Sequence, residues 1–183
     1  VIGYDINNDR INKLNNNLDD TMEISSETLK KAINGNLTIS SNIDDILDCN
    51  FYIITVPTPI DNNNEPDLSA LLNATKSVGK IISKGDIIVY ESTVFPGCTE
   101  EECVPILESE SNLKYNQDFY CGYSPERINP GDKTHTIEKI VKITSGSTKQ
   151  VAKKIDEIYS SVIEAGTCLV SSIKVAEAAK VIE

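Results

Sequence analysis

"FYIITVPTPID", residues 51–61, is an apolar run that stops at a pair of prolines. The near-continuous apolar part, residues 51–56, is typical of a strand buried on both faces of a parallel sheet. Asp67 follows shortly afterwards and can cap a helix that the apolar pattern extends to about Ser83. A strand, a rigid turn and a helix in this order predict one βα unit of an α/β protein.

The same alternation of short strands and longer helices continues on both sides of this stretch. We expect further strands at residues 1–4, 37–39, 86–93, 118–123, 139–146 and 167–170. We expect helices at residues 9–18, 26–33, 42–47, 99–107 and 148–162, and a last helix that starts at Ser171 or Ser172 and still runs at Glu183. Gly35 suits a left-handed cap behind the second of these helices. The pattern predicts an α/β fold with a doubly wound, Rossmann-like, mostly parallel sheet.

Composition limits the class of function. A net charge of −11 disfavours non-specific binding to nucleic acid or to an anionic membrane, so neither is expected as a partner. No apolar run reaches the roughly 18 residues that a membrane-spanning helix needs. Five cysteines, an odd number without any CxxC pair, predict reduced thiols in a cytoplasmic protein. The single histidine, His135, cannot anchor a multi-histidine centre, and no metal site is predicted.

The first residues, "VIGYDINNDR", lack the basic leader and apolar core of a signal peptide. They also open inside an apolar run and without a methionine, so we expect a fragment of a longer protein.

Four polar positions directly follow predicted strands: Asp5, Thr58, Ser92–Thr93 and Glu126. Ligands of doubly wound sheets bind beyond the carboxyl ends of the strands, so these positions are candidate site residues.

Asp5 has two interpretations. An acid that closes the second strand of a dinucleotide fold accepts hydrogen bonds from the ribose of NAD and repels the phosphate of NADP, and Arg10 could return over the adenosine side. Asp5 could equally be the N-cap of the helix that follows. No GxGxxG is present, because no two of the nine glycines stand two apart. The first strand and glycine turn of a dinucleotide fold would therefore lie upstream of residue 1.

The remaining polar candidates, and two further residues, also have a structural explanation. Thr58 and Ser92–Thr93 could face a cofactor, but each alone is more simply part of a βα turn. Cys98 is better explained as a small buried apolar residue than as a nucleophile, because no histidine is near it in sequence. Lys180 stands three residues after Glu177, which usually gives a solvated ion pair, although the alanines around it would let another group approach closely.

Taken together, six segments in order resemble the UDP-glucose/GDP-mannose dehydrogenase family: "GYDIN…R", "TVPTPID…PDLS", "ESTVFPGCTEE", "GYSPERINPGD", "TSGS" and "SSIKVAEAAKVIE". The likeness covers essentially the whole chain. "SPERINPGD" points to the branch that acts on UDP-N-acetylhexosamines, such as UDP-N-acetylmannosamine or UDP-N-acetylgalactosamine. Family members oxidise the primary alcohol of the sugar to a carboxylate with two NAD molecules, through an enzyme-bound thioester, in the synthesis of surface polysaccharide precursors.

The resemblance implies roles for the matched positions. NAD would be contacted by Asp5, Arg10, Val56, Pro57, Thr58, Pro59, Ser92 and Val94. Glu126 would be the acid–base residue of thioester hydrolysis, Thr93 would help to place the water, and Lys180 would stabilise the developing oxyanion. The UDP-sugar would be contacted by Glu126, Arg127 and Lys180.

The prolines on both sides of Glu126 reduce the freedom that would blur the position of a general base. The segment departs from the commoner "PEF" form of the family at Arg127 and Asn129–Pro130, so no role is transferred to Pro130.

By the same resemblance, residues 1–170 would form an NAD-binding domain without its first βα unit, and residues 171–183 the start of a long interdomain helix. None of the five cysteines matches the family nucleophile, so the fragment itself is expected to be inactive, and the full-length protein to be a homodimer. Four alternatives stay open: a UDP-glucose dehydrogenase, a GDP-mannose dehydrogenase, another dehydrogenase of the hydroxyacid or 6-phosphogluconate group, and a non-catalytic nucleotide-sugar binding module.

Overall fold

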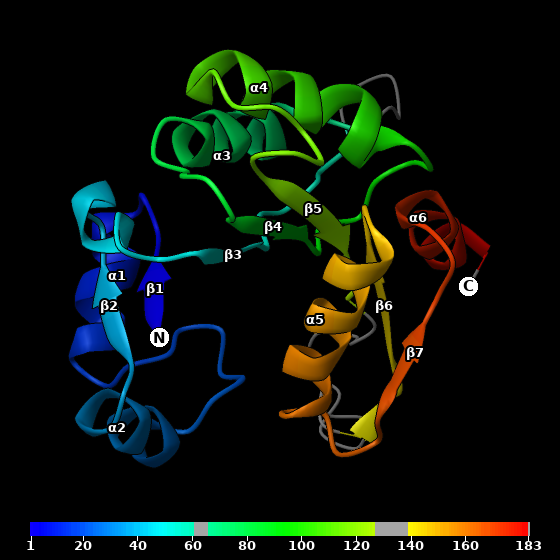
Figure 1. Cartoon of the computed structure of the whole chain (residues 1–183). Coiled ribbons are helices and arrows are strands. Elements are labelled where there is room, and N and C mark those ends of the chain that lie inside the picture. The colour runs from blue at the N-terminus through cyan, green and yellow to red at the C-terminus, as the bar shows by residue number, and fades with distance from the viewer. Residues whose placement is uncertain (61–65, 127–138, 183) are drawn as a thin grey trace. The chain divides into compact units, whose positions relative to one another are not determined.

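The computed structural model of the chain describes residues 1–60, 66–126 and 139–182 (Figure 1). The described chain divides into two compact units. The first runs from Val1 to Cys49, and the second begins at Asn50 and includes the remaining described residues.

The first unit contains two parallel strands, β1 (Ile2–Tyr4) and β2 (Thr38–Ser40), which pair in the register Ile2 with Thr38. Its helices are α1 (Asn8–Asn15), α2 (Ser26–Asn34) and the 3-10 helix η1 (Ile43–Ile46). Each helix begins behind a polar side chain that accepts a backbone N–H, and these N-caps are Asn7, Ser25 and Asn42. The helices bury one apolar residue each, namely Ile11, Leu29 and Ile46.

Two expectations for this unit are wrong in detail. The first helix ends at Asn15 rather than at Leu18, and Asn17 then adopts a left-handed backbone with φ 61°, which asparagine tolerates. Gly35 does follow α2 directly, but its φ is −90°, so it is not the left-handed cap that was expected. Its N–H bonds to the carbonyls of Lys31 and Ala32 without that conformation.

The second unit contains five strands in spatial order: β3 (Phe51–Ile54), β4 (Ile87–Tyr90), β5 (Tyr120–Tyr123), β6 (Lys142–Gly146) and β7 (Thr167–Leu169). β3, β4 and β5 are parallel, and β7 is parallel to β6. β6 runs antiparallel to β5, with Gly122 opposite Gly146. The mostly parallel α/β sheet predicted from the sequence is therefore confirmed.

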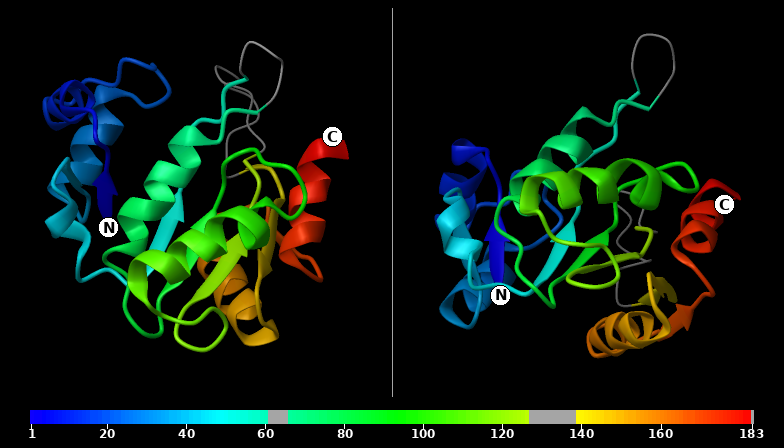
Figure 2. Two further views of the ribbon diagram at one scale, coloured as in Figure 1. Left: turned by 90° about the horizontal axis from the view of Figure 1, so that it is seen from above. Right: turned by 45° about the horizontal axis from the view of Figure 1, so that its top comes forward.

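Helices cover both faces of this sheet (Figures 1 and 2). α3 (Ser69–Gly79) and α4 (Val104–Ser111) lie side by side on one face, and α5 (Lys149–Ser160) lies on the other. The alternation along β4 shows why both faces are apolar: Ile87 and Val89 point to α5, while the hydroxyl of Tyr90 lies 3.2 Å from Thr75 Oγ1 on α3. α6 (Ile173–Ile182) packs beside β5 and β6.

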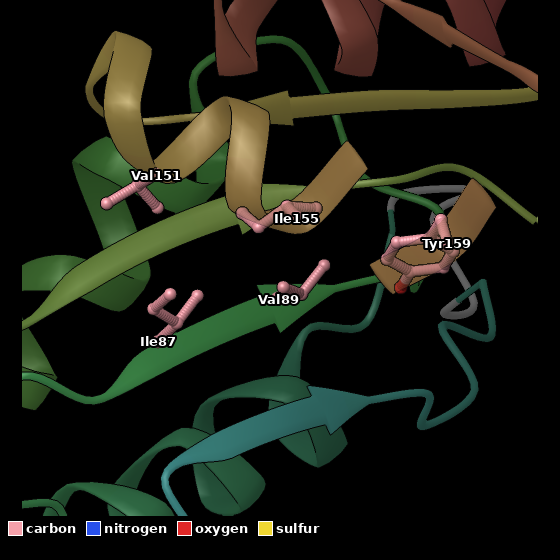
Figure 3. Close-up of a cluster of buried hydrophobic side chains, with 5 residues drawn as sticks. All are labelled: Ile87, Val89, Val151, Ile155 and Tyr159. Atoms are coloured by element: carbon pink, nitrogen blue, oxygen red, sulfur yellow. The ribbon is translucent and has the colours of Figure 1, made fainter. Parts of the chain in front are cut away.

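The core between the sheet and α5 consists of Ile87, Val89, Val151, Ile155 and Tyr159 (Figure 3). Two glycines let α5 approach this closely. A Cβ on Gly146 would lie 2.6 Å from Ala152 Cα, and a Cβ on Gly122 would overlap the Ile155 side chain; both of these residues are on α5. Neither position has room for a side chain.

Two helix starts differ from the prediction. The helix expected at residues 99–107 does begin at Thr99, but its first part is a π-helix, η2 (Thr99–Cys103), before α4 takes over. α3 begins at Ser69, and Leu68 occupies its cap position without a side-chain bond. Asp67 still serves the start of the helix, because its Oδ1 accepts the Ser69 N–H at 2.9 Å.

Candidate active site at the carboxyl ends of the strands

The loops that follow β3, β4 and β5 meet at one edge of the sheet, because these strands are parallel. Ser92 Oγ, behind β4, donates to the carbonyl oxygen of Val56, behind β3, at 2.6 Å. The Tyr123 hydroxyl, at the end of β5, donates to the carbonyl oxygen of Ser92 at 3.0 Å. The structure thus brings Val56 and Ser92 into direct contact. Val94, another predicted cofactor contact, stands two residues after Ser92 and is buried.

Thr58 carries an unsatisfied group in this loop. Its Oγ1 is buried, and no group among the described residues hydrogen-bonds to it. The prolines on either side, Pro57 and Pro59, are exposed. A buried hydroxyl without a protein partner is costly and indicates a place for a polar ligand atom. Thr93 in the neighbouring loop is also exposed.

Glu126 and Lys180 lie together, although 54 residues separate them in the chain. Lys180 Nζ donates to the main-chain carbonyl oxygen of Glu126 at 2.6 Å. The described chain therefore carries a carboxylate and an ammonium group at the carboxyl end of β5. Arg127, the third residue predicted to contact the substrate, lies outside the described residues.

Glu177 is not the partner of Lys180. Its side chain is fully buried and accepts the backbone N–H groups of Gly97 at 2.5 Å and Thr99 at 2.9 Å. The carboxylate therefore joins α6 to the start of η2, where backbone N–H groups attract negative charge. The prediction that Glu177 and Lys180 form a solvated ion pair is therefore wrong.

Sequence reasoning missed a charged cluster beside Glu126. Lys142, at the start of β6, is 2% exposed and contacts Glu91 Oε2 at 2.9 Å and Glu126 Oε2 at 3.4 Å. The Tyr159 hydroxyl donates to Glu91, and Lys142 Nζ lies 5.7 Å from the centre of the Tyr159 ring. Burial, and then the charge of Glu91, raise the pKa of Tyr159. The only signal in the sequence was a lysine within the apolar run "KIVKITSG".

Cys98 is a buried residue, as expected, with no exposed surface. Its hydrogen bond with Cys103, followed by burial, raises the pKa of the Cys98 thiol. Burial also raises the pKa of Cys121, which is equally inaccessible. Raised pKa values and inaccessibility both oppose the thiolate that a nucleophile requires.

Asp5 and Arg10 belong to the first unit. Asp5 follows β1, is exposed, and accepts the Asn7 N–H at 2.8 Å through Oδ1. The N-cap of α1 is Asn7, so the alternative of Asp5 as the cap is wrong. Arg10 Nη1 donates to Asp19 Oδ1 at 2.8 Å and also to Asp20.

The sequence of residues 1–163 matches the family model described as the NAD binding domain of the UDP-glucose/GDP-mannose dehydrogenase family. The chain belongs to this family. The NAD that the sequence predicted as cofactor is thus the ligand for which the family domain is named.

Relatives within the family include UDP-N-acetyl-D-glucosamine 6-dehydrogenase of Salmonella typhi, which is 58% identical over the whole chain. Protein CapL of Staphylococcus aureus is 56% identical. The chain spans 43% and 42% of these two relatives' lengths, respectively. The solved structure of the UDP-D-ManNAc dehydrogenase of Pyrococcus horikoshii superposes on the whole chain with a TM-score of 0.91 at 30% identity, and the chain covers 43% of it.

The residues present fit the NAD of the family. Within the second unit, the Thr58 hydroxyl and the rigid Val56–Pro59 loop offer hydroxyl and backbone groups of the kind with which dinucleotide folds hold their ligand. The first unit by itself offers an exposed acidic group, Asp5, directly behind β1. The part of the chain that the structure describes contains no cluster of three or more residues able to hold a metal ion. Among those same residues, no helix is long and apolar enough to cross a membrane.

Proposed function

We propose that the protein containing this chain is an NAD-dependent UDP-N-acetylhexosamine 6-dehydrogenase, with UDP-N-acetylglucosamine as the first candidate substrate. One observation carries the proposal: Lys180 Nζ lies 2.6 Å from the Glu126 carbonyl oxygen at the carboxyl end of β5, in a chain that belongs to this dehydrogenase family. Relatives 58% and 54% identical to the chain are named UDP-N-acetyl-D-glucosamine 6-dehydrogenases. Relatives named for UDP-N-acetyl-D-mannosamine are 30% identical or less, so that substrate ranks second.

The overall reaction converts the primary alcohol of the sugar and one water into a carboxylate, with two hydrides transferred and three protons released. NAD, when bound, accepts one hydride in each oxidation step. Asp5, Arg10, Val56, Pro57, Thr58, Pro59, Ser92 and Val94 are the residues proposed to hold it. A cysteine outside this chain would carry the thioester, because none of the five cysteines of the chain matches the family nucleophile.

Glu126 and Lys180 have complementary tasks in this proposal. The Glu126 carboxylate would take a proton from the water that attacks the thioester, and Thr93 would help to place that water. The ammonium group of Lys180 would face the oxygen on which negative charge develops, and it would contribute electrostatic stabilisation there. Arg127 would join Glu126 and Lys180 in contacting the UDP-sugar.

Counting the NADH formed per uronate in the full-length protein tests the function. Limiting UDP-N-acetylglucosamine should give two NADH per uronate, and UDP-N-acetylmannosamine assayed in parallel shows which sugar is preferred. A ratio of one would favour a dehydrogenase of the hydroxyacid or 6-phosphogluconate group.

Glu126→Gln separates an enzyme from a binding module. The substitution should cut steady-state turnover at least about a hundredfold and let acyl-enzyme accumulate, because general acid–base catalysis contributes about that much. Turnover unchanged by Glu126→Gln would contradict the role of the carboxylate.

The proposal also includes a homodimer in the full-length protein, a place in surface polysaccharide precursor synthesis and a cytoplasmic location. The proposed location rests on the sequence, which has an odd number of cysteines and no CxxC pair.

A further inference from the structure

We propose that Lys142 is a positioning residue that holds the carboxylate of Glu126 for its reaction, an inference that rests on the proposed function. Lys142 was not among the predicted site residues. The structure places its Nζ 3.4 Å from Glu126 Oε2 and leaves only 2% of its side chain exposed.

The antiparallel run of β6 explains how Lys142 reaches this edge of the sheet. Gly122 pairs with Gly146 and Tyr123 with Ser145. Continuing this register by three residues places Glu126 opposite Lys142. The continuation is real, because Ser124 Oγ donates to the Ile143 carbonyl oxygen at 2.7 Å. In a parallel arrangement, the first residues of β6 would lie beside the amino end of β5, at the opposite end of the strand from Glu126.

Two lysines contact Glu126 at different points. Lys180 binds its main-chain carbonyl oxygen at 2.6 Å, and Lys142 contacts its side-chain oxygen. A main-chain contact fixes the loop but leaves the side-chain torsions of a glutamate free. The contact with Lys142 acts on the carboxylate itself, which is the group that a general base must hold in position.

The cluster around Lys142 keeps its ammonium group in place. Glu91 Oε2 lies 2.9 Å from Nζ, and the second oxygen of Glu91 accepts the Tyr159 hydroxyl. The Glu91 side chain is 10% exposed and that of Glu126 is 38% exposed. Glu91 therefore serves as the buried anchor for Lys142, and Glu126 is the member of the cluster that substrate can reach. A buried ammonium with two carboxylates is also more strongly held than one with a single partner.

A double-mutant cycle in the full-length protein tests the positioning role. Lys142→Met, Glu126→Gln and the double variant are assayed for NADH formation with UDP-N-acetylglucosamine. Lys142→Met alone should lower kcat about tenfold or more, while the KM for NAD stays within about twofold. In the Glu126→Gln background, the same substitution should lower kcat by less than about twofold, since its effect passes through the carboxylate.

Folding is monitored by thermal unfolding, because Lys142→Met removes the ammonium group that contacts the buried Glu91 carboxylate. Should that variant fail to fold, Lys142→Met with Glu91→Gln removes both charges of the buried pair and enters the same cycle. Lys84→Met is the matched control: it deletes a lysine that is 76% exposed and pairs with Asp118, and its kcat should be unchanged.

The outcomes separate the two proposals. If the effects of Lys142→Met and Glu126→Gln on kcat multiply, Lys142 only stabilises the fold, and its positioning role is overturned while the proposed function stands. If Glu126→Gln leaves turnover intact, or if the unmodified protein forms no NADH, the proposed function fails and the role of Lys142 falls with it.

Discussion

Three largely buried carboxylates, those of Asp19, Glu91 and Glu177, are each held by a different set of donors. Asp19 is held mainly by backbone N–H groups within one tight turn, together with Thr21 and Arg10. Glu91 is held by the side chains of Lys142 and Tyr159, and Glu177 by two backbone N–H groups of another segment. Losing each carboxylate should therefore have a different consequence: for Asp19 it concerns local folding, for Glu91 the placement of Lys142, and for Glu177 the docking of a helix.

Asp19 should make the first unit sensitive to acid. Burial alone would raise its pKa, but hydrogen bonds from Ile24, Thr21 and Arg10 outweigh burial and hold the pKa well below its usual range. A depressed folded-state pKa adds stability that is complete above the unfolded value of about 3.9 and is lost as pH falls towards the folded value. Asp19→Asn should therefore lower the free energy of unfolding by about 1–3 kcal/mol at pH 7.

Urea unfolding of the unmodified protein and of Asp19→Asn, at pH 7 and below pH 4, measures the difference in their free energies of unfolding. This difference should shrink in acid. Asp20→Asn is the control, because Asp20 is exposed, and should change stability little at either pH. If Asp19→Asn lowers the free energy of unfolding equally at both pH values, the turn does not depend on the charge of Asp19.

Asp5 should set the preference for NAD over NADP. Its carboxylate is exposed at the end of β1, where the 2′-phosphate of NADP would meet a like charge. Asp5→Ala in the full-length protein should raise kcat/KM for NADP relative to NAD by about tenfold, which corresponds to roughly 1.4 kcal/mol. Asp9→Ala, which removes a neighbouring exposed acid on α1, is the control. No relative gain for NADP would leave Asp5 only its bond to the Asn7 N–H.

At the scale of elements, α6 is docked by Glu177, and this same helix carries Lys180 one turn further on. Glu177→Gln replaces a carboxylate that accepts two N–H groups by an amide whose NH2 faces one of them. We expect a loss of about 1–3 kcal/mol in the free energy of unfolding, since a buried donor loses its partner. We also expect a lower kcat in the full-length protein, because Lys180 moves with α6.

Denaturant unfolding and steady-state kinetics measure both effects of Glu177→Gln. Glu157→Gln on α5 is the control, because Glu157 is 65% exposed and its pair with Lys153, at 3.7 Å, is a surface pair. If Glu177→Gln lowers stability without changing kcat, Lys180 does not depend on this anchor.

Elements with a strong local pattern were predictable from the sequence, and their tertiary partners were not. The apolar runs 51–56 and 86–93 fixed β3 and β4, and parallel strands made it foreseeable that polar residues behind them would share an edge. Glu126 became a candidate because it follows a predicted strand, whereas Lys180 became one only through the family resemblance. Lys142 was missed because its partners, Glu91, Glu126 and Tyr159, come together only through the antiparallel pairing of β6, which no local pattern encodes. The π-helical start of α4 likewise has no signature in "TEEEC".

At the scale of the whole molecule, each sheet has two edge strands whose outer edges are open within the described part of the chain: β1 and β2 in the first unit, and β3 and β7 in the second. If β1 and β2 are the second and third strands of a dinucleotide fold with the strand order 3-2-1-4, they should be neighbours, and they do pair. In the other unit, β3 pairs with β4. The "VIGYD" segment is thus occupied in its own sheet, which argues against its repacking as a substitute for a first strand. Unpaired edges of this kind attract strands from other chains.

The chain of residues 1–183 alone should therefore associate and should not turn over substrate. Its sequence has no GxGxxG to supply amides for the pyrophosphate, and none of its five cysteines matches the family nucleophile. Each backbone group left dry at an open edge would cost about 1–3 kcal/mol, so a strand from a second copy would be stabilising.

Size-exclusion chromatography with light scattering should show a dimer or larger species whose fraction grows with concentration. Calorimetry should show NAD binding far weaker than micromolar, while the full-length protein serves as the positive control for binding and for NADH formation. A monomer at all concentrations that binds NAD with micromolar affinity would contradict the reasoning, because the pyrophosphate would then be held without a glycine turn and the open edges would cost nothing.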